Sequence, residues 1–504
     1  MIRKTTLLIA LLSGPFIGAF AQADLPEMRL DSKELEADMR FLASDQLMGR
    51  RTGSPGNNTA ALYIASRLEA YGFQTVPGAK GYYQEVPFEA VKPPQSGALT
   101  IGKSDYTFGD NFLILSGNAA DLQTSGVYAG YGWVDETTGH DDYKDLDVKG
   151  KVVFVISGIP DNQDPIATFK SFRTKRKLAS ERGAAGLIEL YRLTFPWRFF
   201  RSYFGKESLV LANTDGDSGD DNLVYGWIQE KDKTDLENIQ TDKKTKIHLQ
   251  SGGFSRRPVQ SQNVIGVLPG TDPVLKDEYV VLTAHYDHVG TGRDGGGMFT
   301  PQDSIFNGAR DNAFGTVSLL AAAKAYSQAP TKRSVVILAV TGEEIGLLGS
   351  QYYAEHPLIP LEKTIFNLNT DGAGYNDTGA VSIIGYGRTG TNDQLKKATD
   401  AFGLRIIADP APEQGLFDRS DNVSFAVKGV PAVCFSPGLT EFDQEIAKYY
   451  HQVTDGPETI DYPYLAKFCQ SLTLMGRLVA DMDGKPTWVA GDKYEEAGKK
   501  LYGR

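Results

Sequence analysis

Histidine and acidic residues follow three apolar segments in the second half of the chain. His285 and Asp287 come directly after the run EYVVLTA, and Glu343 and Glu344 come after SVVILAVTG. Asp371 follows the third run, TIFNLNT. Because the carboxyl ends of parallel strands share one edge of a sheet, where ligand sites form, we expect these side chains to gather at that edge.

Two residues of the same types lie in turns. Asp311 stands in NGARDNAFG, before a helix expected from about Gly315, and His451 lies in YYHQVTD, before the last long helix. Burying so many carboxylates without a cation costs more free energy than the net stability of a domain. The pattern therefore predicts a metal centre. Mixed nitrogen and oxygen ligands favour zinc, with cobalt or manganese as substitutes, and a pair of ions needs a bridging carboxylate.

The composition is that of an ordinary globular protein. The chain has 504 residues, which is more than one hydrophobic core usually supports, so two domains are expected. Its formal net charge of -11 argues against nucleic acid as a partner. With 41% hydrophobic residues, there is enough apolar material for a buried core.

The first residues have the features of a secretory signal peptide. Arg3 and Lys4 precede a short apolar run, and Ala19-Phe20-Ala21 is a cleavage site of the small-x-small type. We therefore expect removal of 1–21 and export to the periplasm or the outside of the cell. No Cys stands near the cleavage site, and no later apolar segment has the length of a membrane span, so we expect no membrane anchor.

Strand-like and helix-like patterns alternate at both ends of the chain. Helices are expected at 31–45 and 57–71, before a strand-like run. From about residue 259 the expected strands are NVIGVLPG, EYVVLTAH, SVVILAVT, TIFNLNT and PAVCFSP, and the expected helices are 315–328, 345–356, 391–403 and 463–483. This alternation predicts an α/β fold with a mostly parallel central sheet flanked by helices.

The middle of the chain, from about 96 to 255, has a different pattern. Short β-like runs dominate there, separated by Gly, Asp and Asn turns, and one strongly basic helix is expected at 168–182. The aromatic segment at 195–204, FPWRFFRSYF, is either a lip that faces substrate or a flap packed on its own domain. His140 and His248 have no potential ligand partner nearby in sequence, so we expect them outside the metal centre.

The two cysteines are Cys434, in an apolar run, and Cys469, in an amphipathic helix. Export permits a disulfide, but cysteine often behaves as a small hydrophobic residue in a core. Two buried free thiols are therefore favoured. Neither cysteine lies near a histidine in an arrangement that would make it a nucleophile.

Taken together, the motifs resemble those of the M28 (aminopeptidase Y-like) zinc peptidases. These motifs are HxD, GxxDNxxG, GEExGLxGS, a strand-ending Asp and a late His, and the resemblance covers nearly all of 30–485. The segments GYG, DDYKDLDVKGKVVFV and RGAAGLIEL resemble a protease-associated (PA) domain. The resemblance implies a zinc exopeptidase fold with a β-rich insert. The expected parts are a catalytic domain at 22–95 plus 256–486, a PA-like insert at 96–255 and a tail at 487–504.

The resemblance also implies a metal-binding role for five residues. His285 and Asp371 would bind one zinc ion, Glu344 and His451 the other, and Asp311 would bridge both. The family has a cis peptide bond after the bridging residue, so Asp311-Asn312 is its expected position. We expect His288 to lie behind the metal ligands or at the rim of the site and not to bind metal, because the family's first motif uses one histidine as a ligand.

Glu343 is implied to be the general base. Successive side chains at a strand-to-helix turn point in different directions, so Glu344 can bind metal while Glu343 takes a proton from the attacking water and returns it to the leaving amine. Without the other ligands, two acids here would more often match the dipole at a helix start. Asp287 would orient His285, as ligating histidines require.

The segment RSDNVSFAVKGVPAV departs from the family pattern at one position. The residue after its Asp is often His or Tyr in the family, and here it is Asn422. An amide can still donate a hydrogen bond to a developing oxyanion, so Asn422 is expected to do so. Asp421 either holds a substrate ammonium or braces the loop.

These features predict an exported di-zinc metallo-aminopeptidase that hydrolyses the N-terminal peptide bond of peptides. The family also contains carboxypeptidases and glutaminyl cyclases. A carboxypeptidase would usually add a C-terminal dimerisation domain, for which the chain after His451 is short, and a cyclase lacks counterparts of His285 and Asp371. A non-catalytic binding protein on the same fold is the third alternative, and such relatives lose ligands or the base.

Overall fold

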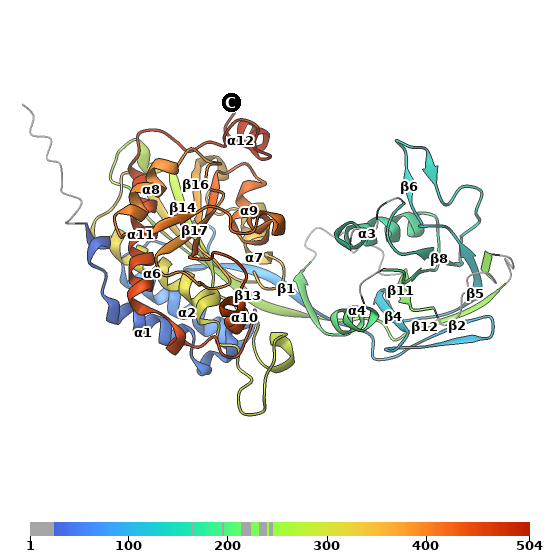
Figure 1. The fold of residues 1–504 in the computed structure, drawn as a ribbon. Helices are drawn as coiled ribbons and strands as arrows, with labels where there is room; N and C mark the ends of the chain where they lie inside the picture. Colours follow the sequence, from blue (N-terminus) through green and yellow to red (C-terminus); the bar gives the residue numbers. More distant parts are fainter. Residues whose placement is uncertain are drawn as a thin grey trace, which may run out of the picture. The chain divides into compact units, whose positions relative to one another are not determined.

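The computed structural model describes residues 25–503, apart from 161, 163–164, 194–195, 213–222, 231–238 and 241–244. The expected signal peptide at 1–21 lies outside the described residues. The chain divides into two compact units, drawn in Figure 1. Unit 1 comprises Met1–Val86 and Ser261–Arg504, and unit 2 comprises Pro87–Gln260.

The insert expected at 96–255 begins and ends inside unit 2, several residues from its limits. The division falls within two long strands, β1 (Tyr83–Lys92) and β13 (Ser255–Leu268), which run through both unit boundaries. A strand continues its alternating pattern across such a boundary, so the sequence carries no signal there. The expected tail belongs to unit 1, where α12 (Glu495–Tyr502) forms its helix.

A nine-stranded sheet holds the strands of unit 1 together with β10 of unit 2, in the order β10-β1-β13-β15-β14-β16-β19-β17-β18. Its other strands are β10 (Ser208–Leu211), β14 (Tyr279–His285), β15 (Ser334–Val340), β16 (Thr364–Asn369), β17 (Ala380–Ile384), β18 (Arg405–Ile407) and β19 (Ala432–Pro437). The central strands β15, β14, β16 and β19 run parallel. On either side of them, β13 and β17 pair antiparallel. The sheet is therefore mixed, with the expected parallel arrangement at its centre.

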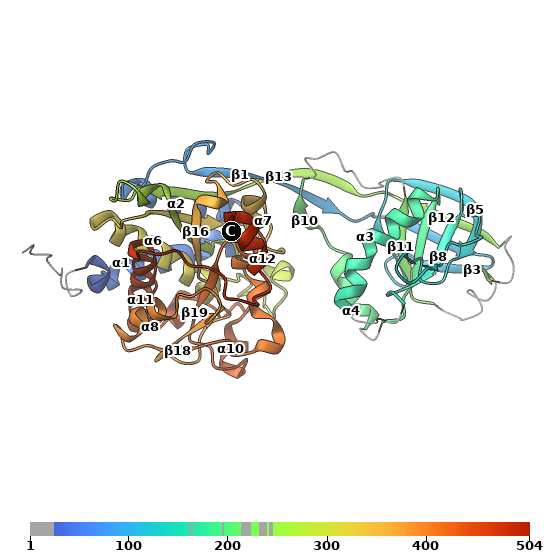
Figure 2. The ribbon, with the colours of Figure 1, turned by 90° about the horizontal axis from the view of Figure 1, so that it is seen from above.

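Helices cover both faces of this sheet. On one side lie α1 (Ser32–Leu42), α6 (Phe314–Gln328), α8 (Asn392–Asp400) and α11 (Tyr462–Asp481), and on the other α7 (Leu348–Glu355) and α9 (Asn422–Ala426), as Figure 1 and Figure 2 show. Strand β14 serves both faces by alternation. Its residues Leu282 and Ala284 belong to the core under α6 and α11, while Val281 belongs to the core under α7 and α9.

Local signals place the first helices close to their expected limits. In α1, the side chain of Asp31 accepts a hydrogen bond from the Lys33 amide. Helix α2 (Pro55–Ala70) begins with proline and is capped by Ser54, and Gly72 follows its end at φ +77°. Helix α2 packs into the same core as α1 and α6. The short helix α10 (Gln444–Tyr449) precedes the loop that carries His451.

Unit 2 has its own eight-stranded sheet, in the order β3-β2-β12-β5-β8-β9-β11-β4. Its strands are β2 (Gly97–Ile101), β3 (Ser104–Thr107), β4 (Phe112–Ser116), β5 (Ala120–Tyr128), β8 (Val152–Ile156), β9 (Gly186–Leu190), β11 (Val224–Ile228) and β12 (Lys246–Ser251), and a separate ribbon pairs β6 (Val134–Asp135) with β7 (His140–Asp141). Strands β5, β8, β9 and β11 run parallel at its centre. The expected basic helix is α3 (Pro165–Glu181).

The aromatic segment forms α4 (Trp197–Phe204) and packs on its own unit. Trp197 and Phe200 are buried in the core of unit 2 against Trp227, whereas Phe199 and Tyr203 are exposed. The structure thus favours the packed flap over the lip. Both cysteines are free and buried, as expected. Within the described part of the chain, no helix combines the length and apolar character needed to cross a membrane.

Candidate metal centre

The ends of three parallel strands deliver side chains to one edge of the sheet in unit 1. His285 is the last residue of β14. Asp371 is the second residue after the end of β16. Glu343 and Glu344 come after β15, in a turn that precedes α7 by several residues. They therefore do not occupy the first turn of a helix, where a dipole match would place them.

Two clusters meet at Asp311. The Nε2 atom of His285 lies 3.1 Å from Asp371 Oδ1 and 3.3 Å from Asp311 Oδ1. The Nε2 atom of His451 lies 3.2 Å from Asp311 Oδ2 and 3.1 Å from Glu344 Oε2. Each oxygen of the Asp311 carboxylate thus faces a different histidine. This is the geometry of a group that can bridge two ions.

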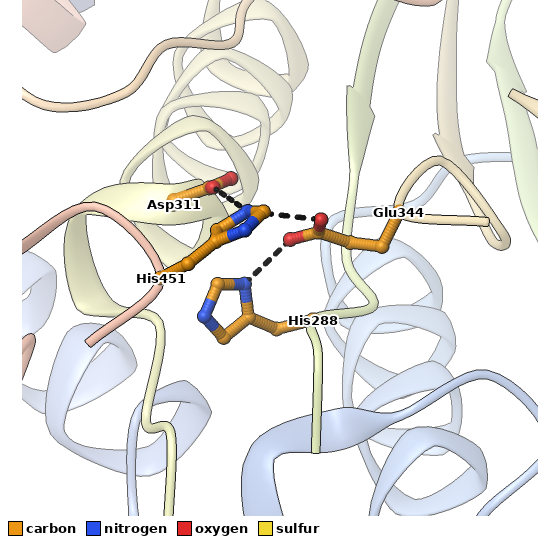
Figure 3. A group of neighbouring side chains, drawn as sticks. All are labelled: His288, Asp311, Glu344 and His451. Carbon is orange, nitrogen blue, oxygen red and sulfur yellow. Dashed lines mark hydrogen bonds and ion pairs between the residues drawn. The ribbon is translucent and has the colours of Figure 1, made fainter. Parts of the chain in front are cut away.

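His288 is a further member of the second cluster, shown in Figure 3 with Asp311, Glu344 and His451. Its Nδ1 atom lies 2.7 Å from Glu344 Oε1, and its ring is buried, with the ring of His451 5.5 Å away. We expected His288 to lie either behind the metal ligands or at the rim of the site. Its contact orients the Glu344 carboxylate from within the protein and not from the rim.

The electrostatics of the centre favour positive charge. Burial alone would lower the pKa of His451, but contacts with Asp311 and Glu344 raise it to about 10. Burial likewise opposes the charged form of Glu344, yet its pKa falls to about 2 beside His288 and His451. Burial raises the pKa of Glu343 well above its ordinary value. Imidazole nitrogens and carboxylate oxygens, at a site that favours positive charge, fit divalent metal ions of the zinc type.

The backbone carbonyl and the side-chain carboxylate of Asp287 have different partners. The backbone carbonyl oxygen of Asp287 lies 3.2 Å from Nδ1 of His285, whereas the nearest carboxylate oxygen lies 3.9 Å away. The carbonyl therefore orients the imidazole. The buried carboxylate accepts hydrogen bonds from the Thr52 hydroxyl at 2.9 Å and from the Glu343 backbone N–H at 3.2 Å. Its function is thus to position Glu343, which the sequence did not suggest.

Asp371 and Asp311 are held by residues that the sequence did not single out. The Ser420 hydroxyl donates a 2.6 Å hydrogen bond to Asp371 Oδ2. The Asp455 carboxylate accepts hydrogen bonds from the backbone N–H groups of Arg310 and Asp311, at 3.0 and 3.3 Å. The peptide bond between Asp311 and Asn312 is cis, as expected.

A buried arginine joins the strand end to the turn of Asp311. The Arg50 guanidinium donates hydrogen bonds to the backbone carbonyls of Tyr286 at 2.9 Å, Asn307 at 2.6 Å and Gly308 at 2.9 Å. Burial lowers the pKa of Arg50 to about 10. Because the planar guanidinium of Arg50 is hydrogen-bonded to both segments, it fixes the distance between the end of the His285 strand and the turn that carries Asp311.

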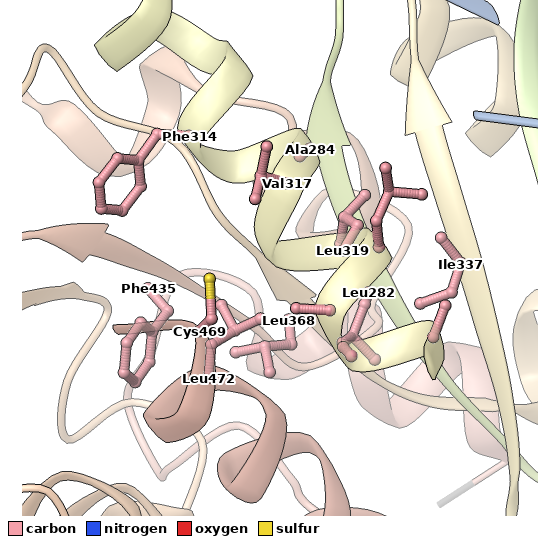
Figure 4. Packing of buried hydrophobic residues seen from close by; sticks show 14 of the residues in the cluster. Leu282, Ala284, Phe314, Val317, Leu319, Ile337, Leu368, Phe435, Cys469 and Leu472 are labelled. Atoms are coloured by element: carbon pink, nitrogen blue, oxygen red, sulfur yellow. The ribbon is translucent and has the colours of Figure 1, made fainter. Parts of the chain in front are cut away.

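The core beneath the centre fixes the helix that follows Asp311. Phe314 and Val317 on α6 pack with Cys469 and Leu472 on α11, and Phe435 on β19 completes the cluster, which Figure 4 shows. The Phe314 and Phe468 rings also meet edge to face, with centroids 5.0 Å apart. Close packing of this kind leaves little freedom for the ligand-bearing turn.

Asn422 does not lie where its expected role requires. Its side chain is fully buried at the start of α9, and its amide donates a 2.9 Å hydrogen bond to the backbone carbonyl of Phe417. Asn422 is also absent from the walls of the cavity described below. Asp421 is also fully buried, and burial raises its pKa to about 7. Asp421 is also absent from the cavity walls, which argues against contact with a substrate ammonium.

A cavity of about 720 Å³, including its open mouth, adjoins the centre. Four of the acidic residues line it: Asp311, Glu343, Glu344 and Asp371. The Tyr450 ring also lines the cavity and stacks on His451, with the centroids 4.1 Å apart. Burial and the nearby carboxylates raise the pKa of Tyr450, so its hydroxyl stays protonated. Its place next to His451 in sequence was the one signal that could have revealed it.

Comparisons with known proteins give this geometry a context. Residues 263–474 match the model of Peptidase family M28. Aminopeptidase YwaD of Bacillus subtilis is 27% identical over 316 residues, which are 62% of this chain and 59% of that protein. The vacuolar membrane protease of Saccharomyces cerevisiae is 34% identical over 126 residues, 25% of this chain and 11% of that protein. The chain therefore spans less than two thirds of these curated relatives.

A solved structure shares the fold. The aminopeptidase from Aneurinibacillus sp. strain AM-1 superposes with a TM-score of 0.58 at 21% identity, covering 92% of this chain and 97% of that one. The family match spans the strand ends and turns that carry His285, Asp311, Glu343, Glu344, Asp371 and His451. Residues 263–474 of this chain are a peptidase family M28 domain.

Proposed function

We propose that this protein is a metal-dependent aminopeptidase that acts on the N-terminal peptide bond of peptides, with two zinc ions in its centre. The observation that carries the proposal is the position of Asp311, whose two carboxylate oxygens face His285 and His451 separately. The family match and the names of the aminopeptidase relatives support the reaction class.

We assign the two ions to two different groups of residues. His285 and Asp371 would hold one ion, Glu344 and His451 the other, and Asp311 would contact both. Co²⁺ and Mn²⁺ are plausible replacements for zinc at sites with these donors. When bound, the ions supply Lewis acidity for the peptide carbonyl and lower the pKa of water.

Glu343 is placed to move the proton. Its side chain lines the cavity, and its Oε2 atom lies 4.0 Å from Nε2 of His285. The Asp287 carboxylate fixes the Glu343 backbone, so the glutamate meets the cavity from a defined direction. Its carboxylate accepts a proton from the attacking water and then donates it to the nitrogen of the leaving amine.

Tyr450 takes the role for which Asn422 was expected. Tyr450 lines the cavity, and its protonated hydroxyl is near enough to the carboxylates of the centre for their charge to raise its pKa. A hydroxyl donor aimed at the carbonyl oxygen stabilises the negative charge that develops there during attack. Asn422 is fully buried and absent from the cavity walls, so its amide is not positioned to meet the carbonyl oxygen of a substrate.

The decisive experiment measures hydrolysis of aminoacyl anilides by the purified protein, before and after removal of metal by a chelator. Activity should vanish on chelation and return with Zn²⁺, and metal analysis should find two ions per chain. Zinc should also raise the melting temperature of the metal-free protein. Activity that survives chelation would overturn the metal mechanism. Cleavage confined to N-blocked peptides would overturn the aminopeptidase assignment in favour of another peptidase.

Export and domain organisation are part of the proposal. We infer that 1–21 is a cleaved signal peptide, that the mature protein acts in the periplasm or outside the cell, and that the insert at 96–255 is a PA-like domain. The mass of the protein recovered from the periplasm or medium tests the cleavage. A full-length N-terminus would contradict it.

A further inference from the structure

The lining of the cavity combines the four carboxylates of the centre with side chains of other kinds. Beyond the four carboxylates, its lining is small, polar or apolar, except for one cation, Arg419. The apolar part of this lining consists of Ile384, Leu416, Pro437, Leu439 and Phe442. A single guanidinium among neutral side chains is a defined recognition element for an anion.

The Arg419 side chain is exposed to solvent and free for such a partner. In the described part of the chain, its guanidinium donates a hydrogen bond to the neutral Gln414 amide oxygen, at 3.3 Å. Within the described part of the chain, no acidic side chain forms an ion pair with it. The neighbouring acid, Asp418, is engaged elsewhere, because it pairs with Lys493 and accepts a 2.8 Å hydrogen bond from the Tyr494 hydroxyl.

The backbone places Arg419 next to the metal centre. The following residue, Ser420, donates a 2.6 Å hydrogen bond to the Asp371 carboxylate. Successive Cα atoms lie about 3.8 Å apart, so Arg419 is tied to a ligand of the centre by one residue. A substrate whose scissile bond lies at the centre is therefore within range of its guanidinium.

The loop that carries Arg419 is fixed by the C-terminal segment. Phe417 is buried, and the Trp488 and Tyr494 rings lie 6.2 and 5.8 Å from its ring. The Arg388 guanidinium lies 4.0 Å from the centroid of the Phe417 ring and binds the Asp492 carboxylate with two hydrogen bonds, at 2.6 and 3.0 Å. Such a loop presents the Arg419 backbone in one position, which reduces the entropy lost on binding.

We propose that Arg419 is a specificity-determining residue that binds a carboxylate of the substrate. A guanidinium meets a carboxylate with two parallel hydrogen bonds and rejects neutral groups of the same size. The carboxylate belongs either to an acidic side chain at the N-terminal residue or to the C-terminus of a short peptide. The inference rests on the proposed peptidase activity and narrows it to anionic substrates.

The test compares matched substrates in the metal-loaded protein and in Arg419→Gln. One arm measures kcat/KM for a glutamyl anilide against a leucyl anilide, and the other for a leucyl dipeptide against the same dipeptide amide. One of these ratios should fall about tenfold or more in the variant, chiefly through KM, since a hydrogen bond to a charged group is lost. Arg419→Lys should restore part of the ratio. Arg40→Gln, which removes an exposed arginine on α1, is the control and should leave both ratios unchanged.

The arm that responds identifies the source of the carboxylate. Unchanged ratios in both arms, with chelator-sensitive hydrolysis of the leucyl anilide intact, would overturn the inference and leave the proposed function standing. Absence of hydrolysis for every substrate by the zinc-loaded wild-type protein would instead overturn the proposed function. Melting temperature reports whether Arg419→Gln folds, and Arg419→Glu provides a second variant that should reverse the preference.

Discussion

Both units have a sheet whose central strands are parallel, but they bury charge in different ways. In unit 2, Lys175 and Glu189 are fully buried and pair at 3.1 Å, and Glu189 also accepts a 2.7 Å hydrogen bond from Tyr225. One positive and one negative group thus compensate each other. Around the centre of unit 1, buried or half-buried acids outnumber the histidines: they are Asp287, Asp311, Glu343, Glu344, Asp371, Asp421 and Asp455, against His285, His288 and His451.

The difference separates a structural ion pair from a binding site. The Glu189 pair completes its own charge and hydrogen bonds, so it needs no ligand. The excess of acid in unit 1 needs a cation, because unpaired buried carboxylates cost more than folding can supply. Net charge of the buried cluster, and not the presence of buried charge, is therefore the useful indicator of a metal centre.

The largest effect is expected for Asp311→Ala, which removes the group shared by the two clusters. The variant should lose both metal ions and all measurable anilide hydrolysis, because the carboxylate faces both histidines. Metal analysis and the hydrolysis assay check this. Asp393→Ala, at an exposed position of α8, is the control and should keep both. Retention of two ions by Asp311→Ala would show that the clusters bind metal independently.

A smaller effect is expected for Glu343→Gln. The substitution keeps the size of the side chain and removes the proton acceptor, so kcat should fall by about 10² to 10⁴-fold. Metal content should stay that of the wild-type protein, because the proposed ligands are other residues. Loss of an ion together with partial activity would mean that Glu343 is a ligand and Glu344 the base.

The sequence predicted the centre better than its surroundings. Strand ends and turns indicated the six side chains that converge, because position at the edge of a parallel sheet follows from the alternation of elements alone. Their individual roles stay predictions. Ser420 and Asp455 were missed, because each acts through a contact whose partner lies far along the chain. Asn422 was misplaced, because a motif gives a residue's type and not the direction of its amide.

The fold showed the same limit. The central strands of unit 1 were expected to be parallel and are, but the sheet is mixed, because β13 and β17 reverse direction. Strand direction depends on the connection between elements, which periodicity does not report. Tyr450 was also missed, since an aromatic residue beside a ligand histidine is as easily part of a core.

Tyr450→Phe should have a smaller effect than Glu343→Gln. Removal of the hydroxyl deletes one donor to the carbonyl oxygen, so kcat should fall by about 10²-fold with little change in KM. The ring remains to stack on His451, so metal content should not change. Steady-state kinetics on the leucyl anilide separate the two constants. A rise in KM alone would assign Tyr450 to substrate binding and leave the oxyanion donor to be found elsewhere.

The smallest effect on activity is expected for the charge pair of unit 2. Glu189→Leu leaves the Lys175 ammonium buried without an opposite charge, which should destabilise unit 2 by about 3–5 kcal/mol. The double variant Lys175→Met and Glu189→Leu should recover most of this loss, since neither charge remains. Urea unfolding followed by tryptophan fluorescence measures both, because three of the four tryptophans, Trp133, Trp197 and Trp227, lie in unit 2.

Zinc content and anilide hydrolysis of the folded double variant should equal those of the wild-type protein. The charges of Lys175 and Glu189 compensate each other in the wild-type protein, so we expect neither to contribute to metal binding. If removing this pair also released metal, buried charge in unit 2 would contribute to the centre. The contrast between a balanced pair and an acid-rich cluster would then fail as a way to distinguish structure from function.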